Sequence, residues 1–312
     1  MPMRKSIFAL SLVLFLFGAV NAQTTAQLFQ RGNQEYAAKQ YSQAIASYSE
    51  VIRRDANQAM AWFNRGQAYY FSGNLDAAIA DYSKALALSP DYTDGWFQLG
   101  LARNRKGDHV LAIDAYTRGI TLKPTDPQFF FNRGIAYADS GDDDAAKRDY
   151  DHALKLNPNY AKAYMNRSGV FFRKKQYDNA LLDIQNAIRL DPANVEALNN
   201  RGVIYSTTRK LDLALADFNK VLELNPKLKK AYLDRAVAYN RAKNNVEALR
   251  DINRAIALDP TYTHAYSLRS ALYFDTKFYG KAKADAEKVL ELDPDNTFAK
   301  NILNRIAAMP KP

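Results

Sequence analysis

Seven prolines stand 34 residues apart along this chain, with no insertion or deletion between them. They are Pro90, Pro124, Pro158, Pro192, Pro226, Pro260 and Pro294. A fixed period of this length indicates stacked structural units, because a single unit cannot bury its apolar face alone. The 312 residues are therefore expected to form an array of repeats, although length alone would suggest two domains.

Eight repeats result when slots 1 to 34 are counted from Thr25. Their bounds are 25–58, 59–92, 93–126, 127–160, 161–194, 195–228, 229–262 and 263–296. Slot 20 is always alanine, slot 8 is always small, slot 4 is large and apolar, and slot 11 is aromatic in six repeats. Slots 4, 8 and 11 share one helical face, as do slots 20, 24 and 27. Each repeat is thus expected to form two amphipathic helices, with slot 8 facing the alanine at slot 20 and proline ending the second helix.

The pattern resembles the tetratricopeptide repeat, W-x-x-L-G-x-x-Y…A-x-x-x-F…P, which has the same period. Residues 96–100 read "WFQLG", and repeat 2 carries Trp62, Gly66 and Tyr69 at the corresponding places. The resemblance covers residues 25–296 and implies an all-α fold, a right-handed α-solenoid (superhelix) of eight helix-turn-helix units. Residues 297–312 are expected to form a C-terminal capping helix and tail. The apolar stripe of that helix consists of Phe298, Ile302, Ile306 and Met309.

Residues 1–22 have the pattern of an export signal. Arg4 and Lys5 precede a short apolar run from Ile7 to Phe17, and small residues end at Ala22. The run is shorter than the roughly 20 residues that span a bilayer. We therefore expect a cleaved signal peptide and an exported protein, periplasmic or secreted, whose mature chain begins at Gln23.

Charged residues recur at two inward-facing slots. Slot 7 is arginine in seven repeats, slot 23 is aspartate in six, and repeat 3 lacks both, with Leu99 and Ala115. Because the two residue types are present or absent together in seven of the eight repeats, the exception being Arg31 with Ser47, we expect partly buried ion pairs between the two helices of six repeats. This makes the recurring arginine a structural residue. Breaking such a pair from one side costs about 3–5 kcal/mol.

No catalytic or metal-binding pattern emerges from the sequence. Cysteine is absent, and His109, His152 and His264 occupy unrelated slots without ligand spacing. The acidic run 139–146 lacks the alternating ligands of a calcium loop and falls at a turn between helices. We therefore expect no enzyme, no cofactor and no metal site, since few residues remain outside the signal and the repeats.

The resemblance implies that the first helices line a concave groove, which slots 2, 5, 6, 9, 12 and 13 face. Slot 5 carries four phenylalanines, and slots 12 and 13 add three more aromatic residues. These are Phe29, Phe63, Phe97, Phe131, Tyr36, Tyr70 and Phe71. Such a strip is typical of a binding surface. The alternative is that the rings pack against the first helix of the neighbouring repeat.

Asparagines at slot 6 form a second element of the expected groove. They are Asn64, Asn132, Asn166 and Asn200. The series is similar to the asparagine ladder of O-linked N-acetylglucosamine transferase, which holds an extended peptide by its backbone. Amides suit that role because they both donate and accept hydrogen bonds. The family's chaperone-binding carboxylate clamp is not supported, because Phe29, Asp94 and Gln98 stand where basic residues would be needed.

Charge is unevenly distributed along the repeats. Residues 23–160 carry 15 basic and 16 acidic side chains, whereas residues 161–312 carry 26 and 17. Four cations of the second half fall in groove slots, namely Lys162, Arg173, Lys230 and Arg241. They suggest an acidic partner at this end. Nucleic acid is not an expected partner of an exported protein.

The sequence predicts a non-catalytic scaffold of the bacterial cell envelope that binds an extended peptide or partner protein in its groove. The alternative is a periplasmic subunit of a polysaccharide or secretion system that contacts glycan, because aromatic faces and amides also suit sugars. Envelope pull-downs and glycan binding would distinguish the two.

Overall fold

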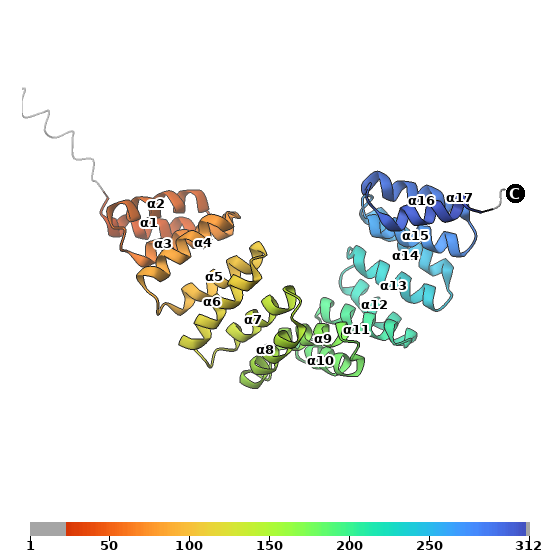
Figure 1. Ribbon diagram of the computed structural model, residues 1–312, viewed down its shortest axis with the longest axis horizontal. Coiled ribbons are helices and arrows are strands. Elements are labelled where there is room, and N and C mark those ends of the chain that lie inside the picture. Colours follow the sequence, from red (N-terminus) through yellow and green to blue (C-terminus); the bar gives the residue numbers. More distant parts are fainter. Residues whose placement is uncertain (1–22, 310–312) are drawn as a thin grey trace, which may run out of the picture. The chain divides into compact units, whose positions relative to one another are not determined.

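The computed structural model describes residues 23–309, so the expected signal peptide lies outside the described residues. Within them the chain forms seventeen α-helices and no strand (Figure 1). The first and second helices of the repeats alternate along the chain. Their bounds are α1 Thr25–Ala37, α2 Tyr41–Arg54, α3 Ala59–Ser72, α4 Leu75–Leu88, α5 Thr93–Lys106, α6 His109–Leu122, α7 Pro127–Asp139, α8 Asp143–Leu156, α9 Ala161–Arg173, α10 Tyr177–Leu190, α11 Val195–Thr207, α12 Leu211–Leu224, α13 Lys229–Arg241, α14 Asn245–Leu258, α15 Thr263–Asp275, α16 Tyr279–Leu292 and α17 Thr297–Ala307.

Two compact units make up the chain, one reaching to His152 and the other starting at Ala153. Within each unit the two helices of a repeat pack on each other, and the second helix also packs on the first helix of the next repeat, as α4 does on α5 and α12 on α13. The fold is an all-α helical repeat solenoid, as expected. The division into units falls inside α8, where the 34-residue period continues unbroken, so the sequence pattern gives no sign of it.

Glycine at slot 8 has a different neighbour from the one expected. A Cβ atom on Gly100 would lie 2.5 Å from Cε1 of Tyr116, and one on Gly66 would lie 2.9 Å from the ring of Tyr82. The close neighbour is therefore the aromatic ring at slot 24, which lies over the glycine, rather than the alanine at slot 20. The alanine is fully buried in every repeat and contributes to the same helix contact.

The three repeats without an aromatic residue at slot 24 also lack glycine at slot 8. In repeat 5 slot 24 is the buried Ile184, and Oγ of Ser168 at slot 8 donates a 2.8 Å hydrogen bond to the carbonyl oxygen of Ala180. Ser270 donates in the same way to Ala282. A smaller side chain at slot 24 thus leaves room for a side chain at slot 8, and the two slots vary together.

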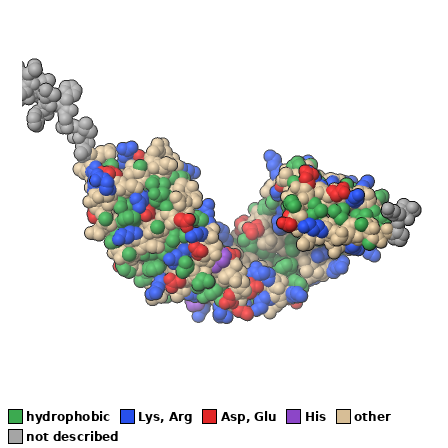
Figure 2. Space-filling view, turned by 45° about the horizontal axis from the view of Figure 1, so that its top comes forward, with side chains coloured by type: hydrophobic (Ala, Val, Ile, Leu, Met, Phe, Trp, Pro, Cys, Tyr) green, Lys and Arg blue, Asp and Glu red, His purple; other side chains and the backbone are tan. Residues whose placement is uncertain are grey.

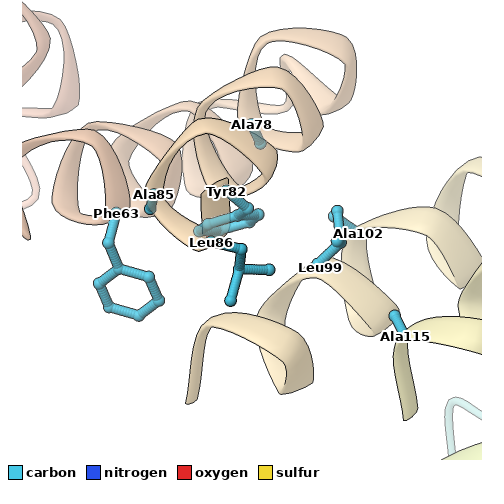
Figure 3. Close-up of a cluster of buried hydrophobic side chains, with 8 residues drawn as sticks. All are labelled: Phe63, Ala78, Tyr82, Ala85, Leu86, Leu99, Ala102 and Ala115. Atoms are coloured by element: carbon cyan, nitrogen blue, oxygen red, sulfur yellow. The ribbon is translucent and has the colours of Figure 1, made fainter. Parts of the chain in front are cut away.

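The apolar core of each unit continues across repeat boundaries. In one cluster, side chains of α3, α4, α5 and α6 meet around Tyr82 and Leu86 (Figure 3). Phe63 and Leu99 enter this cluster from α3 and α5, on either side of α4. Burying apolar side chains between successive repeats is what stabilises a solenoid, since each repeat contacts only its neighbours.

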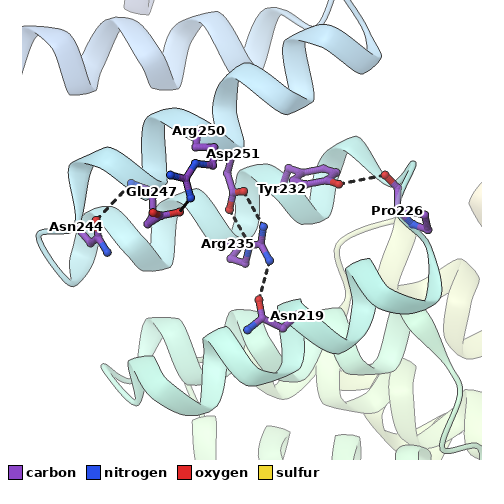
Figure 4. Close-up of polar contacts among 8 residues, drawn as sticks. All are labelled: Asn219, Pro226, Tyr232, Arg235, Asn244, Glu247, Arg250 and Asp251. Atoms are coloured by element: carbon purple, nitrogen blue, oxygen red, sulfur yellow. Dashed lines mark hydrogen bonds and ion pairs between the residues drawn. The ribbon is translucent and has the colours of Figure 1, made fainter.

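All six expected arginine–aspartate pairs are present, which confirms that prediction. The pairs are Arg65–Asp81, Arg133–Asp149, Arg167–Asp183, Arg201–Asp217, Arg235–Asp251 and Arg269–Asp285. Each is bidentate, with Nε and Nη2 donating to the two carboxylate oxygens at 2.7–2.9 Å. In four of them the remaining Nη1 donates to slot 25 of the preceding repeat; Arg235, for example, contacts Asn219 (Figure 4).

Repeats 1 and 3 replace the pair in different ways. Arg31 binds Glu35 on its own helix, and Glu35 accepts a 2.6 Å hydrogen bond from Ser47. In repeat 3, Leu99 and Ala115 are buried instead. The nearby Arg103 donates to the carbonyl oxygen of Leu111, and burial lowers the pKa of its guanidinium. Both unusual residues at slot 11, Glu35 and Arg103, thus occur where the pair is missing.

The turn between the two helices of a repeat uses a left-handed residue at slot 15. Gly73, Gly107 and Gly141 hold φ near +90° in repeats 2 to 4. The other five repeats place a long basic residue there, with φ between 58° and 67°. A side chain in this region is strained by about 1–2 kcal/mol. Proximity to the helix C-terminus, where cations are favoured, partly offsets that strain.

Helix α17 covers the last repeat. Asn296 caps it by accepting from the amide of Ala299, and Ile302 is buried against Val289 and Ala286 of α16. Ile306 and Met309 pack beside them, as expected. The expectation is wrong for Phe298, which is exposed, because Ala299 is the residue of the first turn that faces α16.

Candidate functional site

The four phenylalanines at slot 5 do not form an exposed strip. Phe63 and Phe131 are each 7% exposed, and Phe29 and Phe97 are half-buried. The expectation of an exposed apolar strip is therefore wrong for Phe63 and Phe131. All four rings pack on the tyrosine at slot 24 of their own repeat, with ring centroids 5.6–6.1 Å apart, so they face the helix pair rather than open solvent.

Ring contacts show where these phenylalanines pack. Phe63 lies 5.6 Å from Tyr82 and 4.9 Å from Tyr92 between ring centroids. Phe97 lies 5.2 Å from Phe129, at the start of the next repeat's first helix. For Phe97 this is the alternative considered from the sequence, packing against the first helix of the neighbouring repeat, whereas Phe63 packs on the second helix of its own repeat. Such aromatic pairs each contribute about 0.5–1.5 kcal/mol beyond burial.

An exposed aromatic cluster does exist near the N-terminus of the described chain. Phe71 is 54% exposed and stacks on Tyr41, with an interplanar angle of 17°. Tyr36 and Tyr70 contact Phe71 edge-on at 6.1 and 5.4 Å. Arg105 lies over the ring of Tyr70 at 5.0 Å. We call Tyr36, Tyr41, Tyr70 and Phe71 the aromatic cluster; Tyr41 begins a second helix and was missed because only first helices were considered.

The slot 6 asparagines do not bond to one another. Asn64 donates to Asn33 of the preceding repeat at 3.1 Å. Asn132 and Asn166 donate to the carbonyl oxygens of Gln128 and Lys162, one turn earlier on their own helices. Each of these amides thus has an intramolecular partner through its NH₂ group. Their use as a clamp for a peptide backbone stays a prediction.

One cavity brings together three of the side chains expected in the groove. It has a volume of about 230 Å³ and lies among α9, α11 and α13 of the second unit. The three are Arg173, Asn200 and Lys230, and the remaining lining residues are Ser168, Gly169, Phe172, Val203 and Ile204. Gly169 was not among the residues expected in the groove, although it is the one glycine at a slot that otherwise carries an amide or apolar residue.

The remaining expected cations lie apart from the cavity lining. Arg241 donates to Ser206 at 2.9 Å, which ties α13 to α11, and Lys162 is exposed near the start of α9. The visible face of each unit mixes basic, acidic and hydrophobic side chains (Figure 2). The basic excess of the second half is therefore spread among acidic residues rather than gathered into one patch on that face.

The three histidines lie in unrelated surroundings. His109 shares a 2.8 Å hydrogen bond with Asn104, His152 stacks on Phe130 at 4.1 Å, and His264 lies beside Tyr262. Residues 23–309 contain no group of three or more acidic or histidine side chains placed to hold a metal ion. Among the same residues, no helix has the length and apolar character needed to cross a membrane.

Sequence models of the tetratricopeptide repeat match most of the repeat region. One matches residues 59–92 and 195–228, a second matches 93–126 and 263–296, and a third matches 131–195. A model described as a TPR repeat matches residues 32–73. No curated protein matches the chain.

Solved structures of low sequence identity share the fold. A tetratricopeptide repeat protein from Parabacteroides merdae ATCC 43184 superposes with a TM-score of 0.67 at 19% identity, covering 80% of this chain and 98% of its own. A chain of the APC/C hetero-tetramer Cut9–Hcn1 gives 0.64 at 16% identity, over 94% and 58% of the two chains. Yeast Tom70 gives 0.58 at 16% identity, over 92% and 64%. At such identities the likeness concerns the fold alone.

Proposed function

Because the chain belongs to the tetratricopeptide repeat family, we propose that it is a non-catalytic scaffold of the bacterial cell envelope. It binds an extended peptide segment of a partner protein along the first helices of its repeats. Repeats of this family generally serve protein interaction, and their fold is generally non-catalytic. The envelope location rests on the signal-like residues 1–22.

The observation that carries the proposal is the cavity on first helices of three consecutive repeats. Ligand sites typically combine an apolar floor with a few polar groups at the rim. Here Phe172, Val203 and Ile204 supply apolar surface, and Lys230 and Asn200 supply polar groups. The slots involved, 2, 6, 9 and 13, are those that the family resemblance assigns to partner binding.

Site-directed photo-cross-linking in the exporting cell tests the proposal. A photoreactive amino acid replaces Phe71 or Lys162 on first helices, and Val110 or Leu182 on second helices as controls; all four are exposed. We expect one partner protein to be captured from the first-helix positions and not from the controls. Capture only from the controls, or from none of the four positions, would contradict peptide binding along the first helices.

Cell fractionation tests the location separately. The mature chain is expected in the periplasmic or secreted fraction with Gln23 at its N-terminus. Edman sequencing of the fractionated protein measures this directly. Recovery of the chain in the cytoplasmic fraction with residues 1–22 retained would contradict export.

A second candidate function is favoured by the aromatic cluster. Phe71 and Tyr41 present stacked rings at the surface, and flat aromatic faces suit sugar rings as well as peptides. The chain would then be a periplasmic subunit of a polysaccharide or secretion system. Binding to a glycan array that is lost in Phe71→Ala, with no cross-linked protein partner, would favour this candidate.

A further inference from the structure

The cavity among α9, α11 and α13 exists because slot 9 of repeat 5 is glycine. The other repeats carry a larger residue at this slot. They are Asn33, Gln67, Leu101, Ile135, Val203, Val237 and Ala271. A Cβ atom on Gly169 would meet only Nη1 of Arg173, at 3.9 Å, so no packing contact requires a glycine here.

Gly169 differs in this respect from the slot 8 glycines of other first helices. A Cβ atom on Gly32 or Gly134 would lie 2.7 Å from a buried tyrosine ring, so a side chain at those positions would force the ring to shift. Glycine inside a helix is unfavourable relative to alanine. At Gly169 no neighbouring ring accounts for this cost, and the visible consequence of the glycine is an open cavity.

The cavity has an apolar floor and a basic rim. Ile204 is buried, Val203 and Phe172 are half-buried, and Phe172 is held by an edge-on contact with Tyr177 at 5.6 Å. Lys230 and Arg173 are exposed at the rim. An apolar cavity of roughly 150 Å³ accommodates a benzene ring, so 230 Å³ holds one large apolar side chain.

Lys230 can pair with a ligand without stranding its present partner. Its Nζ lies 2.8 Å from Oδ2 of Asp234, and its side chain is 58% exposed. The same Oδ2 atom accepts a 2.9 Å hydrogen bond from Nδ2 of Asn199. Asp234 therefore keeps a donor when Lys230 turns toward the cavity. The charged side chains that line the cavity are Arg173 and Lys230, with no carboxylate among the lining residues, so the local charge favours an anionic partner.

We infer that this cavity binds one large apolar side chain, of leucine, methionine or phenylalanine size, in an acidic segment of the partner peptide. The apolar side chain lies over Gly169 between Phe172 and Val203, and a neighbouring carboxylate of the peptide pairs with Lys230. The inference rests on the proposed function, since it names the side chain that peptide binding selects. It makes Gly169 a specificity-determining residue.

The test uses the full mature chain, residues 23–312, and labelled peptides of sequence Gly-Asp-Glu-X-Glu-Asp-Gly, read by fluorescence anisotropy. We expect X = Leu, Met or Phe to bind at least about tenfold more tightly than X = Ala, because burying such a side chain favours binding by this much or more. Replacing the four acidic residues by Asn and Gln should weaken binding, and added salt should weaken the acidic peptides alone.

Gly169→Leu fills the cavity and should abolish the preference for large X. The matched control is Gly280→Leu, since a Cβ atom on Gly280 also meets nothing within 4 Å but lies on α16, away from the cavity. Circular dichroism with urea titration verifies that both variants are folded. A preference for large X that survives in Gly169→Leu, or is lost equally in Gly280→Leu, would overturn the assignment to this cavity.

The failures of the two proposals are distinguishable. Binding that is equal for all X overturns the cavity inference while peptide binding stands. The absence of any peptide binding also overturns the cavity inference, and the cross-linking result in cells then decides the proposed function independently.

Discussion

The two units build the same helix hairpin from different cores. In the first unit all four repeats place a buried tyrosine at slot 24 over a glycine at slot 8, beginning with Tyr48 over Gly32. In the second unit only Phe218 over Gly202 follows this scheme. Its other repeats use Ile184, Ile252 or Ala286 with a serine or alanine at slot 8. The comparison shows that glycine at slot 8 is needed where an aromatic ring occupies slot 24, and that the hairpin accepts a side chain there once the ring is gone.

Alkaline pH should produce the largest difference in stability between the two units, by destabilising the first. Burial raises the pKa of Tyr48 to about 12 and raises the pKa values of Tyr82 and Tyr116 further. In the unfolded chain these phenols lose their protons near pH 10. The free energy of unfolding that they contribute is therefore fully present below pH 10 and is lost as the pH rises toward 12. Both tryptophans, Trp62 and Trp96, lie in the first unit. The urea midpoint of tryptophan fluorescence should therefore fall steeply between pH 10 and 12.

A control variant replaces Tyr48, Tyr82 and Tyr116 by phenylalanine. Its fluorescence midpoint should fall much less over the same pH range, because phenylalanine does not ionise. An equal fall in the control would show that the buried phenols are not the cause.

Breaking one ion pair in the second unit should be the next largest effect. Arg167→Leu leaves Asp183 buried and unpaired, which should cost about 3 kcal/mol of unfolding free energy. Adding Asp183→Ala reproduces the Leu99 and Ala115 of repeat 3 and should recover part of that loss. Urea titration followed by circular dichroism measures both. A double variant less stable than both single variants would contradict the role given to the pair.

Changing the residues at slots 8 and 24 of one repeat should have a smaller effect on stability. Gly100→Ala places a Cβ atom 2.5 Å from the ring of Tyr116 and should destabilise the first unit by about 2 kcal/mol. Combined with Tyr116→Ile, the loss should be smaller than the sum of the two single losses, because the ring that causes the clash is gone. Thermal unfolding of the unsubstituted chain, the two single variants and the double variant measures this double-mutant cycle. Strict additivity would show that the slots are independent.

Exchanging glycine and lysine at slot 15 of the turns should have the smallest effect on stability, stabilising the second unit and destabilising the first. Lys243→Gly relieves a side chain at φ 61° and should stabilise the second unit by about 0.5–1 kcal/mol. Gly107→Lys introduces the same strain in the first unit and should destabilise it by about 1 kcal/mol. Paired thermal melts measure both. Shifts of the same sign would mean that backbone strain does not decide this position.

The sequence predicted the hairpins and ion pairs well because their signals are local and recur. Arg65 and Asp81 lie 16 residues apart in one repeat, and the same spacing in six repeats identifies them as partners. The position of Phe63 was not predictable in this way. Whether its ring turns inward depends on the space left by Tyr82 of α4 and by Tyr92 in the loop before α5. The cavity was missed for a related reason, since it depends on what one glycine leaves empty among three helices.

The slot 7 arginine that joins the two helices of its own repeat also contacts the second helix of the preceding repeat. Arg269 contacts Asn253, and Arg235 contacts Asn219, at the same slot one repeat earlier. Excising residues 229–262 as one cassette would therefore bring Arg269 opposite Asn219, an identical side chain in an identical register. Loss or duplication of a whole repeat here would keep this arginine–asparagine contact, so the length of the array can change in steps of one repeat without losing it.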